Sequence, residues 1–482
     1  MQNEKDTINR TISLSVIMPV YNEIYTIESC IEKVLAVKSP YISELEIVVV
    51  DDGSKDGTRE ILREMSKKYP NLTYIEHDTN KGKGAALRTG IERASKDVCI
   101  IQDADLEYDP NDFHKIALPF IKEGADAVFG SRFMVSDYTR LLYYKHALIN
   151  KLLTFMTNVI TDLTFTDMET CYKAIRTNLL KSIPIRSNGF DFEPEISIKL
   201  AKRGAHIFEV PISYSGRTKE EGKKIGWKDG LKAFTTLIKY AIVDDIYKAD
   251  KYGAHILTGL NHAPNFLKWM AEVVKPYIGN NVLEIGAGIG NMTKYFIPRK
   301  KYVVSDINND YLEYLKNYVK NKPYVDVKRV DLSSQNDFVS IKGAFDTVIC
   351  LNVLEHIEDD GAALKNIYSS LSVGGRAIIL VPQGEWLYSS LDEVVGHTRR
   401  YSPEQISKTM QAAGFEIEKM IISFNKIGVL SWIINGKIFK RKHFSKVQLK
   451  VLNTFAGVFR LFDAFLPWMG LSIICIGRKN SN

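Results

Sequence analysis

Short apolar runs alternate along the chain with longer segments in which apolar residues recur every three or four positions. The apolar runs predict strands, of which the first series lies at residues 13–19, 45–50, 72–76, 98–102 and 125–130. The segments between them, such as 26–37 and 57–68, have the spacing of amphipathic helices. A second series of predicted strands lies at residues 281–285, 302–306, 325–330, 345–351 and 375–381, followed by two runs, 415–423 and 471–477, that fit antiparallel edge strands. Strands that alternate with helices predict an α/β fold with crossover helices.

The two series of strands indicate two domains. A chain of 482 residues is longer than one ordinary hydrophobic core supports. A charged, glycine-containing segment at 244–253 interrupts the alternation of strands and helices. We therefore expect one α/β domain over residues 1–250 and a second over residues 251–482, the second with a basic amphipathic C-terminal segment.

The composition, 45% hydrophobic and 25% charged residues, is typical of a globular protein. Five cysteines are scattered without a C-x-x-C pair, which favours a reducing, cytoplasmic compartment. The first residues lack the apolar core of a signal peptide, and no run reaches the roughly 18 to 20 apolar residues of a membrane-spanning helix. The net charge of +7 permits attraction to phosphates or to an anionic membrane. Zinc-finger spacing and RNP-type motifs are missing, so we expect no nucleic-acid partner.

Acidic residues follow two predicted strands of the first domain. Asp51 and Asp52 come directly after the second strand, at the edge where open α/β sheets bind ligands, although Asp-Gly-Ser also forms simple turns. Asp103, Asp105 and Glu107 follow the fourth strand at alternating positions. Such carboxylates can converge on one hard cation, which takes oxygen ligands and keeps contacts to substrate phosphates. The cation would neutralise charge on a departing nucleotide diphosphate.

In this first half the chain resembles the family-two glycosyltransferases of the GT-A fold, specifically those that transfer a sugar to a polyprenyl phosphate of the dolichyl-phosphate type. The motifs that carry the resemblance occur in order: VIMPVYNE at 16–23, VDDGS at 50–54, NKGKGAA at 80–86, QDAD at 102–105, GSR at 130–132 and DMETCYK at 167–173. Processive sugar polymerases of this family carry Q-x-x-R-W and several membrane spans, which this sequence lacks. The resemblance therefore implies transfer of single sugars.

The resemblance also implies which residues hold the donor and a metal ion. A Mg²⁺ or Mn²⁺ ion would be bound by Asp103, Asp105 and Glu107. The residues implied in nucleotide-sugar binding are Pro19, Tyr21, Glu23, Asp52, Lys83, Asp103 and Arg132. The Gly-Lys-Gly form at residues 82–84 is closer to the glucosyl-type members than to the mannosyl-type ones, which favours UDP-glucose over GDP-mannose.

Asp167 is the position that relatives use close to the acceptor. A lipid phosphate is largely anionic near neutral pH, so its attack needs no base and Asp167 would only orient it. A hydroxyl acceptor would instead require Asp167 as the base. The residues that we expect to hold the acceptor phosphate are Arg132, Arg217, Lys223 and Lys224. The alternative for the basic segment 217–228 is a solvated surface loop.

Two apolar and basic segments favour contact with a membrane surface. The segment at 138–163 is rich in Tyr, Leu and Phe, as is typical of a helix that lies flat in a membrane interface, although a buried core helix has the same pattern. The segment at 425–450 interleaves aromatic residues with lysines. That pattern favours an anionic surface or, equally, a basic flank packed on its own domain. We expect peripheral association with the cytoplasmic face of a membrane.

A glycine-rich turn follows the first strand of the second domain. Its glycines, which let a ligand approach the backbone between strand and helix, are Gly286, Gly288 and Gly290. Asp306 ends the next predicted strand, where an acid can hydrogen-bond both hydroxyls of a ribose. The turn alone also fits a dinucleotide, but Glu284 and the later Asp331 favour S-adenosylmethionine.

From about residue 260 to 420 the chain resembles class I methyltransferases. The matching segments are 282–290, 303–306, 330–332, 345–357, 371–375 and 413–415. The resemblance implies that Glu284 meets the methionine end of S-adenosylmethionine, that Asp306 binds its ribose, and that Asp331 lies near its adenine. It does not identify the methyl acceptor.

Methyl transfer is a direct displacement that needs alignment more than acid-base chemistry. If the acceptor hydroxyl must lose a proton, His356 and His397 are the candidate bases; structural hydrogen bonding is the alternative. We expect a bifunctional enzyme that transfers a hexose to a polyprenyl phosphate with inversion and methylates a glycan, a lipid-linked sugar or a related acceptor. The alternative is a glycosyltransferase acting on glycan hydroxyls in cell-surface polysaccharide assembly, whose second domain binds S-adenosylmethionine or docks to a membrane without turnover.

Overall fold

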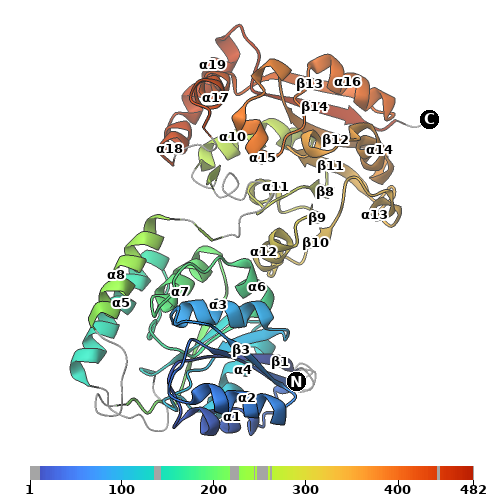
Figure 1. Cartoon of the computed structure of the whole chain (residues 1–482). Coiled ribbons are helices and arrows are strands. Elements are labelled where there is room, and N and C mark those ends of the chain that lie inside the picture. The colour runs from blue at the N-terminus through green and yellow to red at the C-terminus, as the bar shows by residue number, and fades with distance from the viewer. Residues whose placement is uncertain are drawn as a thin grey trace. The chain divides into compact units, whose positions relative to one another are not determined.

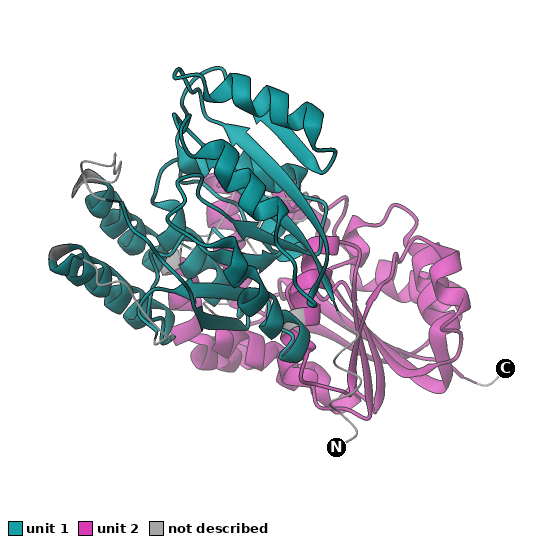
Figure 2. Ribbon diagram, turned by 90° about the horizontal axis from the view of Figure 1, so that it is seen from below, with its two compact units in different colours: residues 1–248 teal, residues 249–482 magenta. Residues whose placement is uncertain are grey.

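The chain divides into two compact units, residues 1–248 and residues 249–482, which have different colours in Figure 2. The computed structural model describes residues 11–134, 143–217, 227–243, 245–246, 259–260, 263–441 and 446–480. Within these ranges, none of the helices combines the length and the apolar content that crossing a bilayer requires.

The first unit contains a seven-stranded mixed sheet. Its strands are β1 (Ile12–Val20), β2 (Ile42–Asp51), β3 (Leu72–Glu76), β4 (Val98–Ile101), β5 (Ala127–Ser131), β6 (Lys173–Arg176) and β7 (Ile207–Pro211). Their order is β3-β2-β1-β4-β6-β5-β7, and β6 runs antiparallel to both β4 and β5. All four residues of β4 are buried, as expected of a strand in a sheet with helices on both faces.

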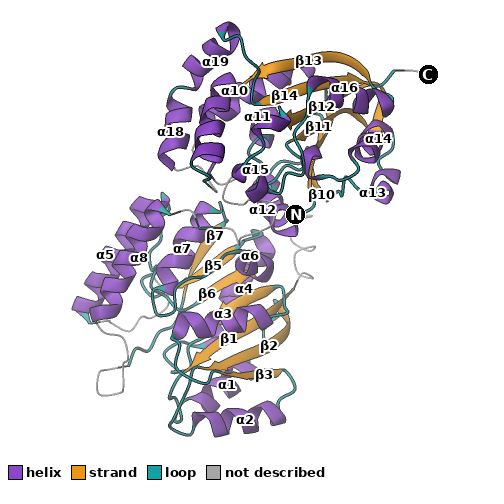
Figure 3. Ribbon diagram, turned by 45° about the horizontal axis from the view of Figure 1, so that its top comes forward, coloured by secondary structure: helices purple, strands orange, loops and turns teal. Residues whose placement is uncertain are grey.

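Helices cover this sheet and place its loops. They are α1 (Ile27–Leu35), α2 (Thr58–Lys68), α3 (Lys83–Arg93), η1 (Pro110–Asp112), α4 (Phe113–Lys122), α5 (Tyr144–Thr161), α6 (Thr177–Ser182), α7 (Phe192–Lys202) and α8 (Trp227–Ile242). α3 packs on β1 and β2, and α4 packs on β5. α5 and α8 lie side by side (Figures 1 and 3) and both contact α7. Because β1, β2 and β4 are parallel, the residues that follow them meet at one edge of the sheet.

The second unit is built on another seven-stranded sheet. Its strands are β8 (Asn281–Ile285), β9 (Lys301–Asp306), β10 (Val325–Arg329), β11 (Phe345–Leu351), β12 (Leu371–Pro382), β13 (Glu416–Phe424) and β14 (Ser472–Arg478). Their order is β10-β9-β8-β11-β12-β14-β13. β8 to β12 are parallel, and β14 runs antiparallel between β12 and β13.

Both faces of the second sheet are covered. The helices are α10 (Pro264–Val274), η2 (Lys275–Tyr277), α11 (Thr293–Phe296), α12 (Asn309–Val319), α13 (Gln335–Val339), η3 (Leu354–His356), α14 (Asp360–Ser370), η4 (Glu385–Leu387), α15 (Ser390–Val395), α16 (Pro403–Ala412), α17 (Lys426–Trp432), η5 (Ile433–Ile438), α18 (Lys446–Thr454) and α19 (Ala456–Phe465). Adjacent residues of β8, Val282 and Leu283, belong to two separate apolar clusters. The expected α/β class is confirmed in both units.

Candidate functional sites in the two units

The acidic residues after β4 lie at the carboxyl edge of the first sheet. Asp103, Asp105 and Glu107 are partly buried, with side-chain exposures of 23%, 19% and 11%. Burial, together with the carboxylates of Asp103 and Glu107, raises the pKa of Asp105 from 3.8 to about 6. Carboxylates that repel one another in this way gain electrostatic stabilisation from a cation.

Arg217 supplies positive charge to this acidic group. Its Nη2 atom lies 3.0 Å from Asp105 Oδ2 and 3.0 Å from Glu23 Oε1. Its backbone N–H donates to Glu107 Oε1 at 2.7 Å, and the Tyr214 hydroxyl donates to Glu107 Oε2 at 2.7 Å. The sequence predicts that Arg217 holds phosphate groups, whereas here its guanidinium faces the acids of the expected metal site.

The donor set of this edge fits a divalent metal ion. Asp103 and Asp105 offer carboxylate oxygens, which are the ligands that Mg²⁺ and Mn²⁺ prefer. A bound cation would lower the raised pKa of Asp105 again. Glu107 accepts from the Tyr214 hydroxyl and the Arg217 backbone, whereas Asp103 and Asp105 pair with the side chains of Lys83 and Arg217. Metal binding by these three carboxylates stays a prediction.

Lys83 begins α3 beside these acids. Its Nζ lies 2.9 Å from Asp103 Oδ1 and 3.1 Å from Glu193 Oε1. Burial lowers the pKa of Lys83, but the two carboxylates raise it overall, so the side chain stays cationic. Gly82 permits this placement, because a Cβ there would lie 2.3 Å from the carbonyl oxygen of Asn188. The Gly-Lys-Gly motif therefore brings a buried cation to the acidic edge.

Asp52 organises the loop that precedes α3. Its carboxylate is 3% exposed and lies 2.7 Å from His77 Nδ1. It also accepts the backbone N–H groups of Lys81 at 2.9 Å and Gly82 at 2.7 Å. Asp52 is thus bonded within the protein, and its contact with a nucleotide stays a prediction.

Three further residues named from the sequence lie at the end of β1. Pro19 is partly buried, Tyr21 is 37% exposed, and Glu23 is buried against Arg217. They share an edge with the acids after β4, because β1 and β4 are parallel neighbours. The structure thus brings together the residues implied in donor binding.

Asp167 is fully buried against Arg132. Its two oxygens accept from Arg132 Nε at 2.7 Å and Nη2 at 2.8 Å, and the Asn150 side chain adds a bond of 3.2 Å. Burial alone would raise the pKa of Asp167. The Arg132 guanidinium outweighs this effect, so the pKa lies below its ordinary value. Both carboxylate oxygens are thus occupied by Arg132, and the role of Asp167 toward an acceptor stays a prediction. Lys223 and Lys224 lie outside the described residues.

Three charged residues near Asp167 and Lys83 were given no role from the sequence. Glu193 is buried and pairs with Lys83. The burial of Glu169 and the charge of Glu193 raise the pKa of Glu169 to about 7. Burial lowers the pKa of Lys173 to about 8, and its Nζ donates to the Met168 carbonyl at 2.6 Å. Glu169 and Lys173 lie in one of the family motifs, whereas no local pattern marks Glu193.

The glycine turn after β8 depends on backbone geometry. Gly286, Gly288 and Gly290 have φ values of +69°, +57° and +75°, a region that other residues disfavour. A Cβ on Gly286 would lie 2.2 Å from Cγ2 of Val353. The Gly288 N–H donates to Asp306 Oδ2 at 2.8 Å, so the acid at the end of β9 fastens the turn. Three of the five residues of the turn lack a side chain, and Ala287 and Ile289 are buried, which fits a ligand that approaches the backbone.

Three carboxylates lie at or just beyond the carboxyl ends of β8, β9 and β10. Glu284, 3% exposed in β8, accepts from the hydroxyls of Thr293 and Tyr302 at 2.7 Å each, and burial raises its pKa to about 7. Asp306 ends β9, and Asp331 follows β10. The glycine turn and these acids fit S-adenosylmethionine, while the individual contacts of Glu284, Asp306 and Asp331 with it stay predictions.

His356 and His397 come together beyond β11, with ring centroids 4.9 Å apart. His356 Nδ1 lies 3.0 Å from the Gly396 carbonyl, and His397 Nδ1 lies 2.9 Å from Asp392 Oδ1. Burial and the neighbouring His397 lower the pKa of His356. Between them the structure adds Glu355, which is 0% exposed and which the sequence did not indicate.

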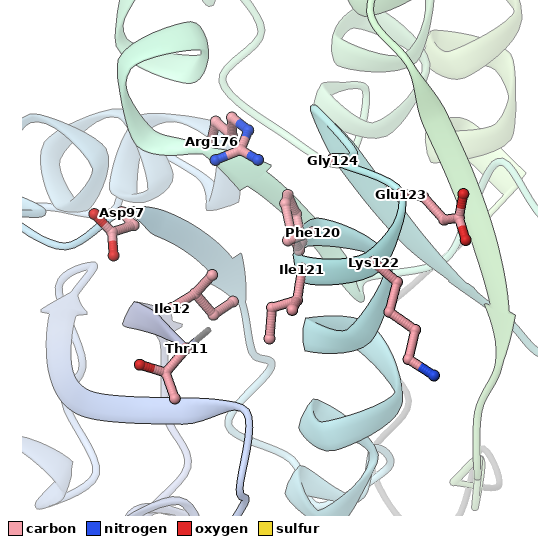
Figure 4. A pocket seen from close by; sticks show the side chains of 9 residues that line it. All are labelled: Thr11, Ile12, Asp97, Phe120, Ile121, Lys122, Glu123, Gly124 and Arg176. Carbon is pink, nitrogen blue, oxygen red and sulfur yellow. The ribbon is translucent and has the colours of Figure 1, made fainter. Parts of the chain in front are cut away.

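A pocket of about 710 Å³ lies at the opposite edge of the first sheet, at the start of β1 and the end of α4 (Figure 4). The Asp97 carboxylate in its lining accepts from the Ser13 backbone at 2.9 Å. Arg176 Nε donates to the Ala125 carbonyl at 2.9 Å. These two charged groups are bonded within the protein and do not converge on the pocket, so we assign it no chemistry.

Comparison with known proteins identifies both units. Residues 15–183 match the family model described as Glycosyl transferase family 2, and residues 283–377 match the model described as Methyltransferase domain. Among solved structures, glucosyl-3-phosphoglycerate synthase of Mycobacterium tuberculosis, in complex with Mn²⁺, UDP and phosphoglyceric acid, is 21% identical. That alignment covers 50% of this chain and 81% of the synthase, with a TM-score of 0.38.

Three of the relatives illustrate how much of the chain is shared. The dolichol-phosphate mannosyltransferase of Pyrococcus furiosus is 31% identical over 45% of this chain, and the chain spans 60% of that relative's length. The polyprenol monophosphomannose synthase of Mycolicibacterium smegmatis is 27% identical over 44% of the chain and 80% of the synthase. An uncharacterized protein of Methanocaldococcus jannaschii is 32% identical over 41% of the chain and 86% of that protein. Through its first unit the chain belongs to glycosyl transferase family 2, and through its second it carries a methyltransferase domain.

Proposed function

We propose that the first unit transfers one hexose from a nucleotide sugar to a polyprenyl phosphate, with inversion and with the help of a divalent metal ion. The observation that carries this proposal is the acidic group after β4, in which Asp103 pairs with Lys83 and Asp105 has a raised pKa. The names of two relatives, a dolichol-phosphate mannosyltransferase and a polyprenol monophosphomannose synthase, support a lipid phosphate as the acceptor.

The charges at this edge suit a nucleotide diphosphate. Asp103 and Asp105 would hold Mg²⁺ or Mn²⁺, which when bound neutralises charge on the leaving diphosphate. Lys83 remains cationic because two carboxylates flank it, and it lies where it can pair with a phosphate that approaches Asp103. Arg132 keeps one orientation because Asp167 binds two of its nitrogens.

The environment of Asp167 supports a phosphate acceptor over a hydroxyl acceptor. A hydroxyl must lose its proton to a base within hydrogen-bonding reach, whereas an anionic phosphate needs none. Asp167 is 0% exposed, and both of its oxygens are bonded to Arg132. We therefore propose that Asp167 positions Arg132, whose guanidinium pairs with the acceptor phosphate, together with Lys223 and Lys224.

The reaction is tested by following labelled hexose into lipid. We expect transfer from UDP-glucose into an organic-extractable product when polyprenyl phosphate is present, loss of transfer after chelation, and recovery with Mn²⁺ or Mg²⁺. The Gly-Lys-Gly motif favours UDP-glucose, whereas the named relatives are mannosyl enzymes, so GDP-mannose is assayed in parallel. Label that enters product only when a glycan hydroxyl is supplied would contradict the lipid-phosphate acceptor.

We also propose that the second unit uses S-adenosylmethionine to methylate a glycan, a lipid-linked sugar or a related acceptor. The glycine turn supports this cofactor because it lets a ligand come close to the backbone. Glu284, Asp306 and Asp331 support it because each of three adjacent strands supplies one acid. Glu284 would meet the methionine end, Asp306 the ribose and Asp331 the adenine.

Apolar side chains on two helices support peripheral contact with a membrane. On α5 the exposed stripe consists of Leu148, Leu152, Phe155 and Val159, and on α8 it consists of Leu231, Phe234, Ile238 and Ile242. The sequence indicates the first stripe but not the second. All five cysteines are buried and unpaired, which suits a reducing compartment and thus the cytoplasmic face.

In the second predicted membrane segment, 425–450, some apolar side chains are exposed and others pack on the second unit. Leu430, Ile434 and Phe439 are exposed, whereas the Trp432 Nε1–H donates to Asp392 at 3.3 Å. Lys442 and Phe444 lie outside the described residues. We therefore propose the α5 stripe as the primary contact.

Changing Leu152 and Phe155 together to Asp is expected to weaken binding of the full chain to phosphatidylglycerol vesicles by at least about tenfold, because a buried apolar side chain contributes about 1.5–3 kcal/mol. These side chains are 57% and 64% exposed, so folding should be preserved. Val339→Asp is the matched control, since Val339 is 70% exposed in the second unit. Equal vesicle binding by the double variant and the parent in a sedimentation assay would contradict the proposed contact.

A further inference from the structure

Glu355, His356 and His397 form a compact cluster at the carboxyl end of β11. Glu355 and His356 lie in η3, and His397 follows α15. One ligand atom from each of the three side chains lies within 4.8 Å of the other two. The cluster thus combines one carboxylate with two imidazoles from segments about forty positions apart in the chain.

The hydrogen bonds of the two histidines determine which nitrogen is left for a ligand. The Gly396 carbonyl can only accept, so His356 donates to it from Nδ1 at 3.0 Å. Asp392 likewise accepts from His397 Nδ1 at 2.9 Å. Each ring therefore keeps the lone pair of Nε2 free for a ligand, and Nε2 of His397 lies 3.5 Å from Glu355 Oε1. Metal-binding histidines have this arrangement, with the second ring nitrogen bonded to a carbonyl or a carboxylate.

The partner of His397 is itself firmly held. Asp392 is 0% exposed and accepts from Arg400 Nε at 2.9 Å and from the Ser389 backbone at 2.9 Å. Arg400 also donates to the Gln383 carbonyl at 3.0 Å. The orientation of His397 is therefore maintained by a buried network rather than by solvent.

Glu355 provides an independent indication of a ligand. Its side chain is 0% exposed, yet neither carboxylate oxygen has a hydrogen-bond partner among the described residues. Buried carboxylates are ordinarily hydrogen-bonded, paired with a cation or bound to a metal. Its Oε1 lies 3.5 Å from His397 Nε2, which is the lone-pair side of that ring. The unsatisfied carboxylate therefore lies within reach of both imidazoles, since one ligand atom of each side chain is within 4.8 Å of the other two.

We propose that Glu355, His356 and His397 bind a first-row divalent transition-metal ion through one carboxylate oxygen and two Nε2 atoms. Mixed imidazole and carboxylate ligands favour ions such as Zn²⁺, Mn²⁺ or Co²⁺ over Ca²⁺. Three protein ligands leave coordination positions open for an oxygen of another molecule, as in catalytic metal sites. The histidines are then ligands, not the bases considered from the sequence.

The position of this site indicates the class of methyl acceptor, a point that rests on the proposed use of S-adenosylmethionine. β11 is the parallel neighbour of β8, and Val353 packs on Gly286 in the glycine turn. The ion would therefore bind the oxygen of an alcohol, such as a sugar hydroxyl, beside the methyl donor. As the C–O bond forms, the methyl carbon–sulfur bond breaks and its electron pair stays on sulfur. The hydroxyl proton passes to water.

The test is titration of the metal-free full chain with Co²⁺, followed by visible absorption. A site with two histidines is expected to give absorption distinct from that of an all-oxygen octahedral site. The first unit has its own acidic group, so the titration is repeated in Asp105→Asn, which should retain the histidine-dependent band. Glu355→Gln and His397→Asn should each weaken Co²⁺ binding by at least about tenfold, since metal affinity depends on every ligand.

Binding of S-adenosylmethionine, measured by calorimetry, separates this inference from the proposed function. Loss of the band in Glu355→Gln with normal cofactor binding supports the metal site and shows that the unit is folded. Absence of the band in the parent chain, or its persistence in both variants, overturns the metal site whatever the cofactor result. A band in the parent without any cofactor binding overturns the proposed cofactor but leaves the metal site standing.

Discussion

Asp105→Asn is expected to lower kcat/KM for sugar transfer by about 10³-fold, the loss that follows removal of one main stabiliser of charge in a transition state. Asp105 is one of two carboxylates proposed to hold the metal ion directly, and an amide oxygen lacks the charge that a divalent ion requires. The loss should appear in kcat at saturating donor and metal, measured as labelled hexose in the organic phase.

The stability of Asp105→Asn shows whether its lower kcat is caused by unfolding. Because the pKa of Asp105 is raised from 3.8 to about 6 in the folded chain, the metal-free folded state binds that proton more tightly than the unfolded state. Its free energy of unfolding therefore falls as pH rises from about 4 to about 6. The Asn side chain does not titrate, so Asp105→Asn does not lose stability as the pH rises. Above pH 6 we therefore expect this variant to be as stable as the parent or more stable by about 1–2 kcal/mol.

Asp109→Asn is the matched control for Asp105→Asn. Asp109 is exposed in the same loop and accepts the Asn111 N–H at the start of η1, a capping role that Asn also fills. Activity within about twofold of the parent is expected for such a surface change. Equal activity of Asp105→Asn and the parent would show that the acidic group does not bind the catalytic metal, and the proposed sugar transfer would lose its main support.

Gly286→Val is expected to weaken S-adenosylmethionine binding by at least about 10³-fold, because it strains the turn and forces the backbone away from Val353. The added Cβ would lie 2.2 Å from Val353 Cγ2, well inside van der Waals contact, and the backbone φ of +69° disfavours a β-branched residue. Calorimetric titration measures the affinity. Sugar transfer should stay unchanged, because the first unit has its own sheet and apolar core.

Gly457→Val provides the comparison for Gly286→Val. Gly457 lies in α19 of the same unit, is exposed, and has no atom within 4 Å of an added Cβ among the described residues. Its cofactor affinity should match that of the parent. Unchanged cofactor binding in Gly286→Val would mean that the ligand of the second unit binds elsewhere.

Most strands could be located from the sequence because burial on both faces makes them continuous apolar runs. The predicted ranges 72–76, 281–285 and 345–351 coincide with β3, β8 and β11. The sequence did not reveal β6 and β7. β6 has only four residues and begins and ends with a basic side chain, and every residue of β7 is only partly buried, so neither produces an apolar run.

The candidate sites were predictable where their residues adjoin a strand, and not where distant loops meet. Contiguous motifs identified the acids after β4 and the glycine turn after β8. No spacing rule connects Arg217 with Glu23, which are 194 positions apart, or Lys83 with Glu193. These contacts depend on how loops close over the sheet edge, and that closure depends on packing that one sequence does not display.

The position of β14 affects the order in which the two units can fold during translation. The strands of the first sheet are complete once residue 211 has been made, so that sheet can form while later residues are still being added. In the second sheet β14 separates β12 from β13, so β13 has no neighbour until residues 472–478 have left the ribosome. Until then one edge of β12 and both edges of β13 are unpaired, and unpaired strand edges are sites at which chains associate.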